Sequence, residues 1–234
     1  MIDINKTLDL IKFKFYNEWI YTSHLYDEGI SEYHKTLTNR VVEMYIDPLN
    51  IPKTAAILDM GCGPGYFLDI MKERGYTNMM GITLSDTDIK IARDKGHNVK
   101  DYDMSFLPQK DGFNDETIDF IFCRQALEHS PYPIFTLIEY NRVLKQGGKI
   151  YIEMPAPDQA RRHEYNTNHY SVLGHHQIAA LLERTGFSVK DFNDITYDIT
   201  IPANVPGNDS DEDLILQEKM YCVVATKTRP LDIK

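Results

Sequence analysis

Short apolar runs in this chain alternate with longer stretches in which apolar residues recur at helical spacing. The short runs predict buried strands, and the longer stretches predict helices that lay one apolar face on a sheet. We expect strands at 55–60, 79–85, 99–103, 117–123, 149–153, 187–191 and 220–227, and helices at 65–75, 86–95, 133–145 and 174–185. This alternation predicts an α/β fold whose parallel sheet carries helices on both faces and binds ligands at the carboxyl ends of its strands.

Three stretches do not follow this alternation. Residues 1–50 are rich in aromatic and charged side chains and predict two or three helices that form a cap or lid on a main domain of residues 51–234. The aromatic residues there either pack the helices onto the domain or cover the ligand. Residues 155–174 and 198–217 are polar and lack a period, so we expect two irregular insertions, and long loops of this kind are often functional.

Composition and charge narrow the class of protein. The formal net charge of −10 argues against a surface that follows nucleic-acid phosphates. The three cysteines are scattered and suggest a reducing compartment. We see no signal peptide and no apolar stretch near the length of a membrane span, and therefore expect a cytoplasmic protein that does not bind membranes.

A glycine-rich turn follows the first predicted strand, in Asp59-Met60-Gly61-Cys62-Gly63-Pro64-Gly65. Bare glycines let the backbone approach a ligand closely, and the helix that follows aims its N-terminus at the same place. The spacing is neither that of a dinucleotide-binding loop nor that of a P-loop. The carboxylate of Asp59, just before the turn, is placed to hold an ammonium group.

The segment Ile57–Gly65 resembles the first motif of the class I S-adenosylmethionine-dependent methyltransferases, nearly residue for residue. Four further segments are similar to parts of that family: 103–108, 119–129, 142–148 and 182–187. The resemblance covers about residues 55–190 and the last strand. It implies a Rossmann-like, doubly wound sheet of seven mostly parallel strands, with the last strand antiparallel beside the sixth, in addition to the N-terminal helices. It also implies S-adenosylmethionine as cofactor and S-adenosylhomocysteine as product.

The resemblance further implies where the cofactor binds. The three glycines would line its methionine and ribose part, Asp103 would accept a hydrogen bond from the adenine amino group, and the backbone near Arg124 would approach the methionine end. The complete expected set is Asp59, Gly61, Cys62, Gly63, Gly65, Thr83, Leu84, Asp103, Met104, Ser105, Arg124 and Gln125.

One position departs from the family pattern. The family usually ends its second strand with an acid that binds both ribose hydroxyls, whereas this chain has Thr83. A hydroxyl binds a ribose less strongly than a carboxylate does, so either the cofactor is bound more weakly or Asp86 or Asp88 compensates. The pattern Gly81-Ile82-Thr83-Leu84-Ser85 also resembles the cyclopropane-fatty-acid synthase branch, which acts on lipid chains.

Methyl transfer from a sulfonium needs mainly positioning, and a hydroxyl acceptor benefits from a general base. His129 and Glu128 follow the fourth strand and are the candidate catalytic residues, although His129 is equally compatible with packing in a loop. The insertion at 155–174 supplies the candidate substrate-binding residues Arg161, His163, Tyr165 and His169. Its histidines fit no standard metal-site spacing, so we expect no metal.

We therefore expect a methyltransferase that acts on a small polar acceptor, with a sugar-containing compound as one candidate. Three alternatives stay open. They are a module of the same fold that binds the cofactor without transferring a methyl group, a nucleic-acid methyltransferase, and an enzyme that modifies lipids like the cyclopropane synthases. The sequence does not indicate the oligomeric state.

Overall fold

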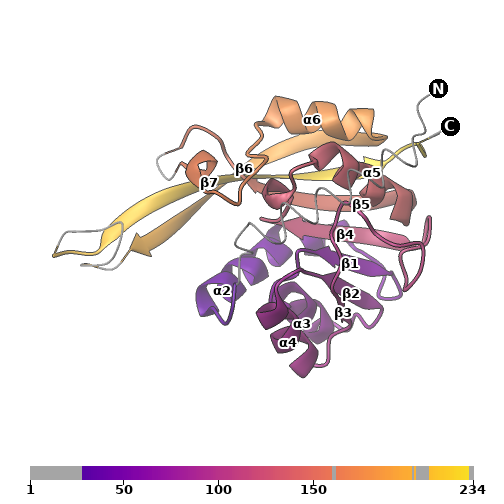
Figure 1. The fold of residues 1–234 in the computed structure, drawn as a ribbon, viewed down its shortest axis with the longest axis horizontal. Coiled ribbons are helices and arrows are strands. Elements are labelled where there is room, and N and C mark those ends of the chain that lie inside the picture. The colour runs from indigo at the N-terminus through magenta and orange to yellow at the C-terminus, as the bar shows by residue number, and fades with distance from the viewer. Residues whose placement is uncertain (1–27, 160–161, 202, 204–210, 232–234) are drawn as a thin grey trace.

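The computed structural model describes residues 28–159, 162–201, 203 and 211–231 (Figure 1). Seven strands form one sheet in the order β3-β2-β1-β4-β5-β7-β6. The strands are β1 (Ile57–Met60), β2 (Met79–Ile82), β3 (Val99–Lys100), β4 (Ile118–Arg124), β5 (Leu144–Pro155), β6 (Phe187–Ile201) and β7 (Leu214–Lys227). Strands β1 to β5 pair in parallel, and β7 is antiparallel to both β5 and β6. The expected doubly wound sheet, with its last strand beside the sixth, is confirmed.

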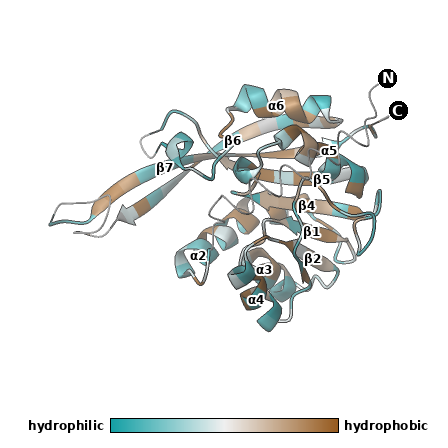
Figure 2. Cartoon of the chain, in the orientation of Figure 1, coloured by the Kyte–Doolittle hydropathy of each residue, from teal (hydrophilic) through white to brown (hydrophobic). Residues whose placement is uncertain are grey.

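Helices cover both faces of this sheet. They are α2 (Glu32–Val41), α3 (Tyr66–Glu73), α4 (Asp86–Asp94), α5 (Pro133–Val143) and α6 (His175–Arg184). One apolar cluster joins the sheet to α5 and α6, and the other joins it to α2, α3 and α4. Neighbouring residues of one strand divide between them, as Ile57 and Leu58 do. The central strands are hydrophobic in Figure 2 because both of their faces are buried.

Local sequence explains where the helices begin. Ser85 caps α4, since its hydroxyl accepts a hydrogen bond from the backbone N–H of Asp88 at 3.0 Å. Gly65 precedes α3 in the left-handed conformation, with φ of 87°. Ser31 caps α2 in the same manner as Ser85 caps α4. Helix α2 continues into a π-helical turn, Val42–Ile46, and a 3-10 turn, Asp47–Leu49, so residues 32–49 are helical. The rest of the expected N-terminal cap, residues 1–27, lies outside the described residues.

The prediction of an irregular insertion at 198–217 was wrong at residues 198–201 and 214–217, which are strand, while residues 202 and 204–210 lie outside the described part of the chain. Strands β6 and β7 pair from Phe187 with Lys227 to Ile201 with Leu214, and they extend beyond the body of the molecule as a long hairpin (Figure 1). Apolar residues alternate with polar ones from Ile195 to Ile201, which is the period of a strand with one buried face. We read the surrounding acids as a loop signal and missed this alternation.

The helix predicted at 133–145 is shorter than expected. It ends at Val143, and β5 begins at the next residue, where Leu144 is already extended with ψ of 138°. Leu144 pairs with Ile118 of β4, so sheet pairing takes over from the helix before the two glycines at 147 and 148. None of the helices in the described part of the chain combines the length and apolar character needed to cross a membrane.

Candidate functional site

A cavity of about 390 Å³ opens at the carboxyl ends of β1, β2 and β4. Its floor is the glycine turn, and its walls come from α2, the loop after β5 and the β6–β7 hairpin. Most residues that the sequence assigned to the site line this cavity: Gly61, Gly63, Thr83, Leu84, Asp103, Met104, Ser105, Arg124, Gln125, Glu128, His129, His163 and His169. Residues far apart in the sequence thus meet where parallel strands end.

The glycine turn needs its glycines for two reasons. Gly61 and Gly63 have φ of 75° and 48°, where side chains with a Cβ are strained. A Cβ on Gly61 would lie 2.5 Å from the Cβ of Ala126, and a Cβ on Gly63 would fall on the carboxylate of Glu28. The turn therefore presents bare backbone to the cavity.

Three other residues expected to bind the cofactor do not line the cavity. A Cβ built on Gly65 would lie 3.1 Å from the His97 ring, and the thiol of Cys62 lies next to Gly81 of β2. Asp59 is only 3% exposed, at the end of β1. Burial raises the pKa of Asp59 well above its ordinary value, and the nearby Glu28 carboxylate raises it further. Asp59 is thus a buried residue of β1 and not part of the cavity lining.

The segment that leads into α2 crosses the cavity next to this turn. The backbone N–H groups of Glu28 and Gly29 donate to the carboxylate of Asp88, both at 2.9 Å. The Tyr66 hydroxyl donates to the carbonyl of Gly29 at 2.9 Å. The carboxylate of Asp88 is thereby engaged with the chain backbone. Burial is the main reason that the pKa of Glu28 rises to about 7.

The segment expected at the adenine forms one wall of the cavity. Asp103 is 3% exposed and accepts a hydrogen bond from the backbone N–H of Ser105 at 2.7 Å. Burial raises the pKa of Asp103 to about 6, and the bonds from Ser105 limit the rise. The hydroxyls of Ser105, Ser130 and Thr136 hydrogen-bond one another and fix this wall. Thr83 lies at the end of β2 and lines the same cavity.

A buried ion pair lies under the opposite wall. Arg124 Nε is 3.1 Å from Glu153 Oε1, and the two side chains are 6% and 0% exposed. Glu153 also accepts hydrogen bonds from Gln125 at 3.0 Å, Tyr151 at 2.8 Å and Tyr197 at 3.0 Å. The Glu153 carboxylate therefore holds the side chains of both Arg124 and Gln125.

The candidate catalytic residues line the same cavity as the glycine turn. Glu128 and His129 belong to a 3-10 turn, Leu127–His129, that follows β4. His129 Nδ1 is 3.0 Å from the carbonyl oxygen of Asn168, so this nitrogen carries the proton and donates. Burial is the main cause that lowers the pKa of His129. Burial also raises the pKa of Glu128 to about 8.

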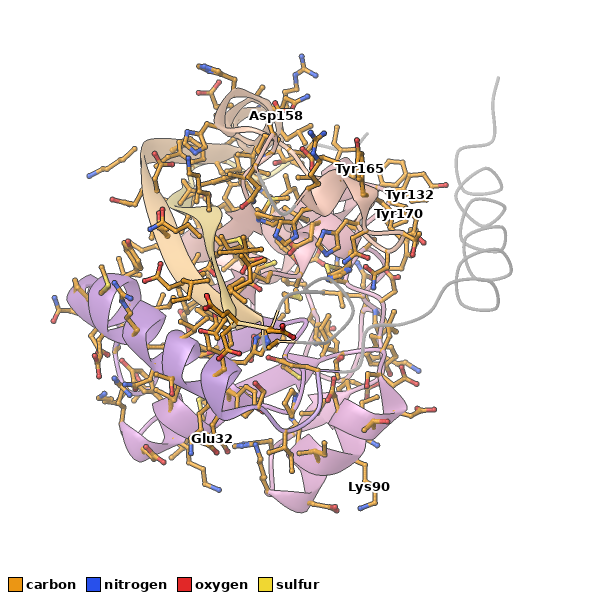
Figure 3. The ribbon with its side chains drawn as sticks, turned by 90° about the vertical axis from the view of Figure 1, so that its left-hand side faces the viewer. Glu32, Lys90, Tyr132, Asp158, Tyr165 and Tyr170 are labelled. Carbon is orange, nitrogen blue, oxygen red and sulfur yellow. The ribbon has the colours of Figure 1, made fainter. Side chains whose placement is uncertain are left out.

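Only some of the candidate substrate-binding residues in the loop after β5 line the cavity. His163 and His169 line the cavity, with their rings stacked 5.2 Å apart and 1° from parallel. Tyr165 does not line it; its side chain is 74% exposed and stands on the outer surface in Figure 3. Arg161 lies outside the described residues. Its neighbour Arg162 reaches the Tyr165 hydroxyl at 3.2 Å on that surface.

Several residues of the cavity wall escaped the sequence analysis. Glu28, His34 and Leu37 come from the chain before and within α2, and Ile199 and Glu218 come from the β6–β7 hairpin. Glu218 accepts a hydrogen bond from His163 Nε2 at 2.7 Å. The alternation of apolar and polar residues in β6 was a signal for the hairpin, but no local pattern marked Glu28.

Comparisons with known proteins agree with this geometry. A family model described as a methyltransferase domain matches residues 27–191. A ubiquinone biosynthesis O-methyltransferase of Saccharophagus degradans is 30% identical over 111 residues, which are 46% of this chain and 46% of that protein. A relative of the same name from Idiomarina loihiensis is 31% identical over 99 residues, 41% of this chain and 40% of that protein. The chain thus spans about half the length of the curated relatives it matches, or less.

A solved structure has the same fold. An S-adenosylmethionine-dependent methyltransferase from Archaeoglobus fulgidus aligns with a TM-score of 0.63 and 20% identity, over 82% of this chain and 94% of that chain. At this identity the likeness concerns the fold alone.

Proposed function

Since the chain belongs to the methyltransferase-domain family, we propose that it is an S-adenosylmethionine-dependent methyltransferase and that it methylates a hydroxyl oxygen of a small polar acceptor. The observation that carries this proposal is a single cavity that joins the glycine turn to His129. A cofactor on the turn and an acceptor near His129 would lie end to end within it. The names of the relatives, which are O-methyltransferases, support oxygen as the acceptor atom.

The bare turn at Gly61 and Gly63, the wall around Asp103 and the end of β2 at Thr83 would hold the cofactor. When bound, S-adenosylmethionine supplies an electrophilic methyl group on a sulfonium, which leaves as a neutral thioether. The carboxylates of Glu28, Asp88 and Asp103 around this end of the cavity favour the positive charge of the sulfonium and the ammonium group.

His129 is the group that handles the acceptor's proton in this proposal. Its Nδ1–H donates to Asn168, so its Nε2 carries the lone pair, and its lowered pKa keeps the ring neutral near pH 7. The acceptor O–H would give its proton to Nε2 while its oxygen took up the methyl group that the bound cofactor would supply, with the electron pair of the broken carbon–sulfur bond left on sulfur.

The polar wall favours a small acceptor over the alternative substrates. Acidic residues line the cavity at Glu28, Asp88 and Glu218, which opposes the phosphates of a nucleic acid. The same polar residues oppose a lipid chain. Sugars remain one acceptor class and small hydroxylated rings another.

Transfer of a labelled methyl group tests the proposal. We expect the protein to label a member of an acceptor panel that includes sugars, phenols and catechols. His129→Ala should bind S-adenosylmethionine with unchanged affinity in calorimetry but lose at least a hundredfold in turnover. His176→Ala, which removes an exposed imidazole outside the cavity, is the matched control. Full turnover in His129→Ala would remove His129 from the mechanism, and binding without any transfer would favour a module that only holds the cofactor.

A further inference from the structure

One carboxylate and two imidazoles meet at the acceptor end of the cavity. Glu128 and His129 come from the turn after β4, and His169 comes from the loop after β5. One possible ligand atom from each of the three lies within 4.8 Å of the others. Residues 40 positions apart in the sequence thus bring the donor types of a transition-metal site together.

Hydrogen bonds join the two loops that carry these side chains. The backbone N–H groups of Tyr170 and Ser171 donate to the carbonyl of Glu128, at 2.8 and 3.0 Å. The Ser171 hydroxyl donates to the carbonyl of Ser130 at 2.7 Å. The cluster is therefore built on a fixed backbone, as a binding site requires.

The outer contacts of His129 orient its imidazole in the manner of a metal ligand. A histidine that binds a metal usually donates its other ring N–H to a carbonyl or carboxylate. His129 does so through Nδ1 to the carbonyl of Asn168, which presents Nε2 for a ligand bond. The ring of His169 is stacked on His163, which is itself held by Glu218 at 2.7 Å.

The carboxylate of Glu128 gives independent evidence for a bound cation. Its side chain is buried, with the residue 2% exposed, and it lines the cavity. Its Oε2 atom has no hydrogen-bond partner among the described residues. A buried polar atom without a partner is costly, and a bound cation would remove that cost.

We propose that Glu128, His129 and His169 bind one divalent first-row transition ion, such as Zn²⁺, with a coordination position open to the cavity. One oxygen and two nitrogen ligands suit Zn²⁺, Mn²⁺ or Fe²⁺ better than Mg²⁺ or Ca²⁺, which prefer oxygen. Three protein ligands with an open position are typical of catalytic rather than structural sites. In a tetrahedral site with bonds of about 2.1 Å the ligand atoms lie roughly 3.4 Å apart, so small side-chain rotations would close the cluster.

The consequence for catalysis rests on the proposed function. An ion at this place would bind the acceptor's hydroxyl oxygen and make that hydroxyl more acidic. Its proton would leave to water, the oxygen would form its bond to the methyl carbon, and the bond from that carbon to sulfur would break with its electrons left on sulfur. His129 Nε2 would then bind the ion and would not accept the acceptor's proton.

Metal binding by the purified, chelator-treated chain tests the proposal directly. Calorimetry with Zn²⁺ and Mn²⁺ should give one ion per chain, and Co²⁺ should give visible absorption bands that report bound nitrogen and oxygen ligands. Glu128→Gln and His169→Ala should each weaken binding at least tenfold, whereas His176→Ala should not change it. Glu218→Gln, which alters the contact that holds His163 beside His169, should weaken binding less than Glu128→Gln or His169→Ala does. Circular dichroism checks that each variant is folded.

Absence of stoichiometric metal binding by the wild-type chain would overturn the proposal. Glu128→Gln and His169→Ala variants that bind the metal as tightly as the wild-type chain would overturn it as well. Parallel titration with S-adenosylmethionine and the labelled-methyl assay separate this outcome from failure of the proposed function. Stoichiometric binding that depends on Glu128 and His169 supports the site even if no methyl group is transferred. Methyl transfer by a chain that binds no ion would refute the site and retain His129 as the base.

Discussion

Gly63→Ala is expected to separate cofactor binding from folding. At φ of 48° an alanine costs about 1–2 kcal/mol of strain, and the stiffer unfolded chain returns about 0.4–1 kcal/mol. The free energy of unfolding should therefore fall by about 1 kcal/mol, as measured in urea. The added methyl group would point at the Glu28 carboxylate and into the cavity, so affinity for S-adenosylmethionine should fall at least tenfold in calorimetry.

Gly96→Ala is the matched control for this experiment. Gly96 has φ of 84°, and nothing lies within 4 Å of a Cβ built there. The same strain should therefore lower stability by about 1 kcal/mol without a change in affinity. Combining Gly63→Ala with Glu28→Ala removes the clash within the protein but leaves the methyl group in the cavity. Affinity in the double variant that stays below that of Glu28→Ala alone supports contact with the cofactor. A folded Gly63→Ala variant with wild-type affinity would refute our placement of the cofactor.

Three further predictions concern the cavity walls. Glu153→Gln leaves the buried Arg124 guanidinium without its counter-charge, so the free energy of unfolding in urea should fall by about 3 kcal/mol or more, whereas Lys90→Ala, which breaks an exposed pair, should have little effect. A charged Asp103 accepts from an adenine amino group more strongly than a protonated one does, and its raised pKa means that the charged form is lost as the pH falls through about 6. Cofactor affinity should decline over that range, and a weaker affinity in Asp103→Asn that no longer varies with pH would support the assignment. Thr83→Asp should bind the cofactor about tenfold more tightly, because a carboxylate makes stronger hydrogen bonds to hydroxyls; unchanged affinity would show that the end of β2 does not face the ribose.

The sequence predicted the parts of this molecule that depend on local pattern. The apolar runs identified the strands, and the glycine spacing of residues 61–65 identified the turn. The family resemblance added Asp103 and the position of β7, and the sheet order agrees with it. These features were predictable because a buried strand requires apolar residues, and a turn with positive φ favours glycine, at the positions themselves.

The residues that complete the cavity are brought there by tertiary contacts, so no local sequence pattern identified them. Glu28 reaches the glycine turn because Asp88 and Tyr66 hold the chain beside it. Glu218 meets His163 only because β6 and β7 continue as a long hairpin. The cluster at Glu128 needed the loop after β5 to fold back on the turn after β4, which spacing along the chain does not reveal.

The place of β7 in the sheet has a consequence for synthesis on the ribosome. This strand is made last among the seven but lies inside the sheet, between β5 and β6. Its end is locked by Lys227, which is 2% exposed and donates to the carbonyl of Leu144 at 2.7 Å. Until β7 emerges, β5 presents an open edge that other chains can pair with. Nascent chains stalled before residue 214 would therefore expose this edge of β5, although their glycine turn is already complete.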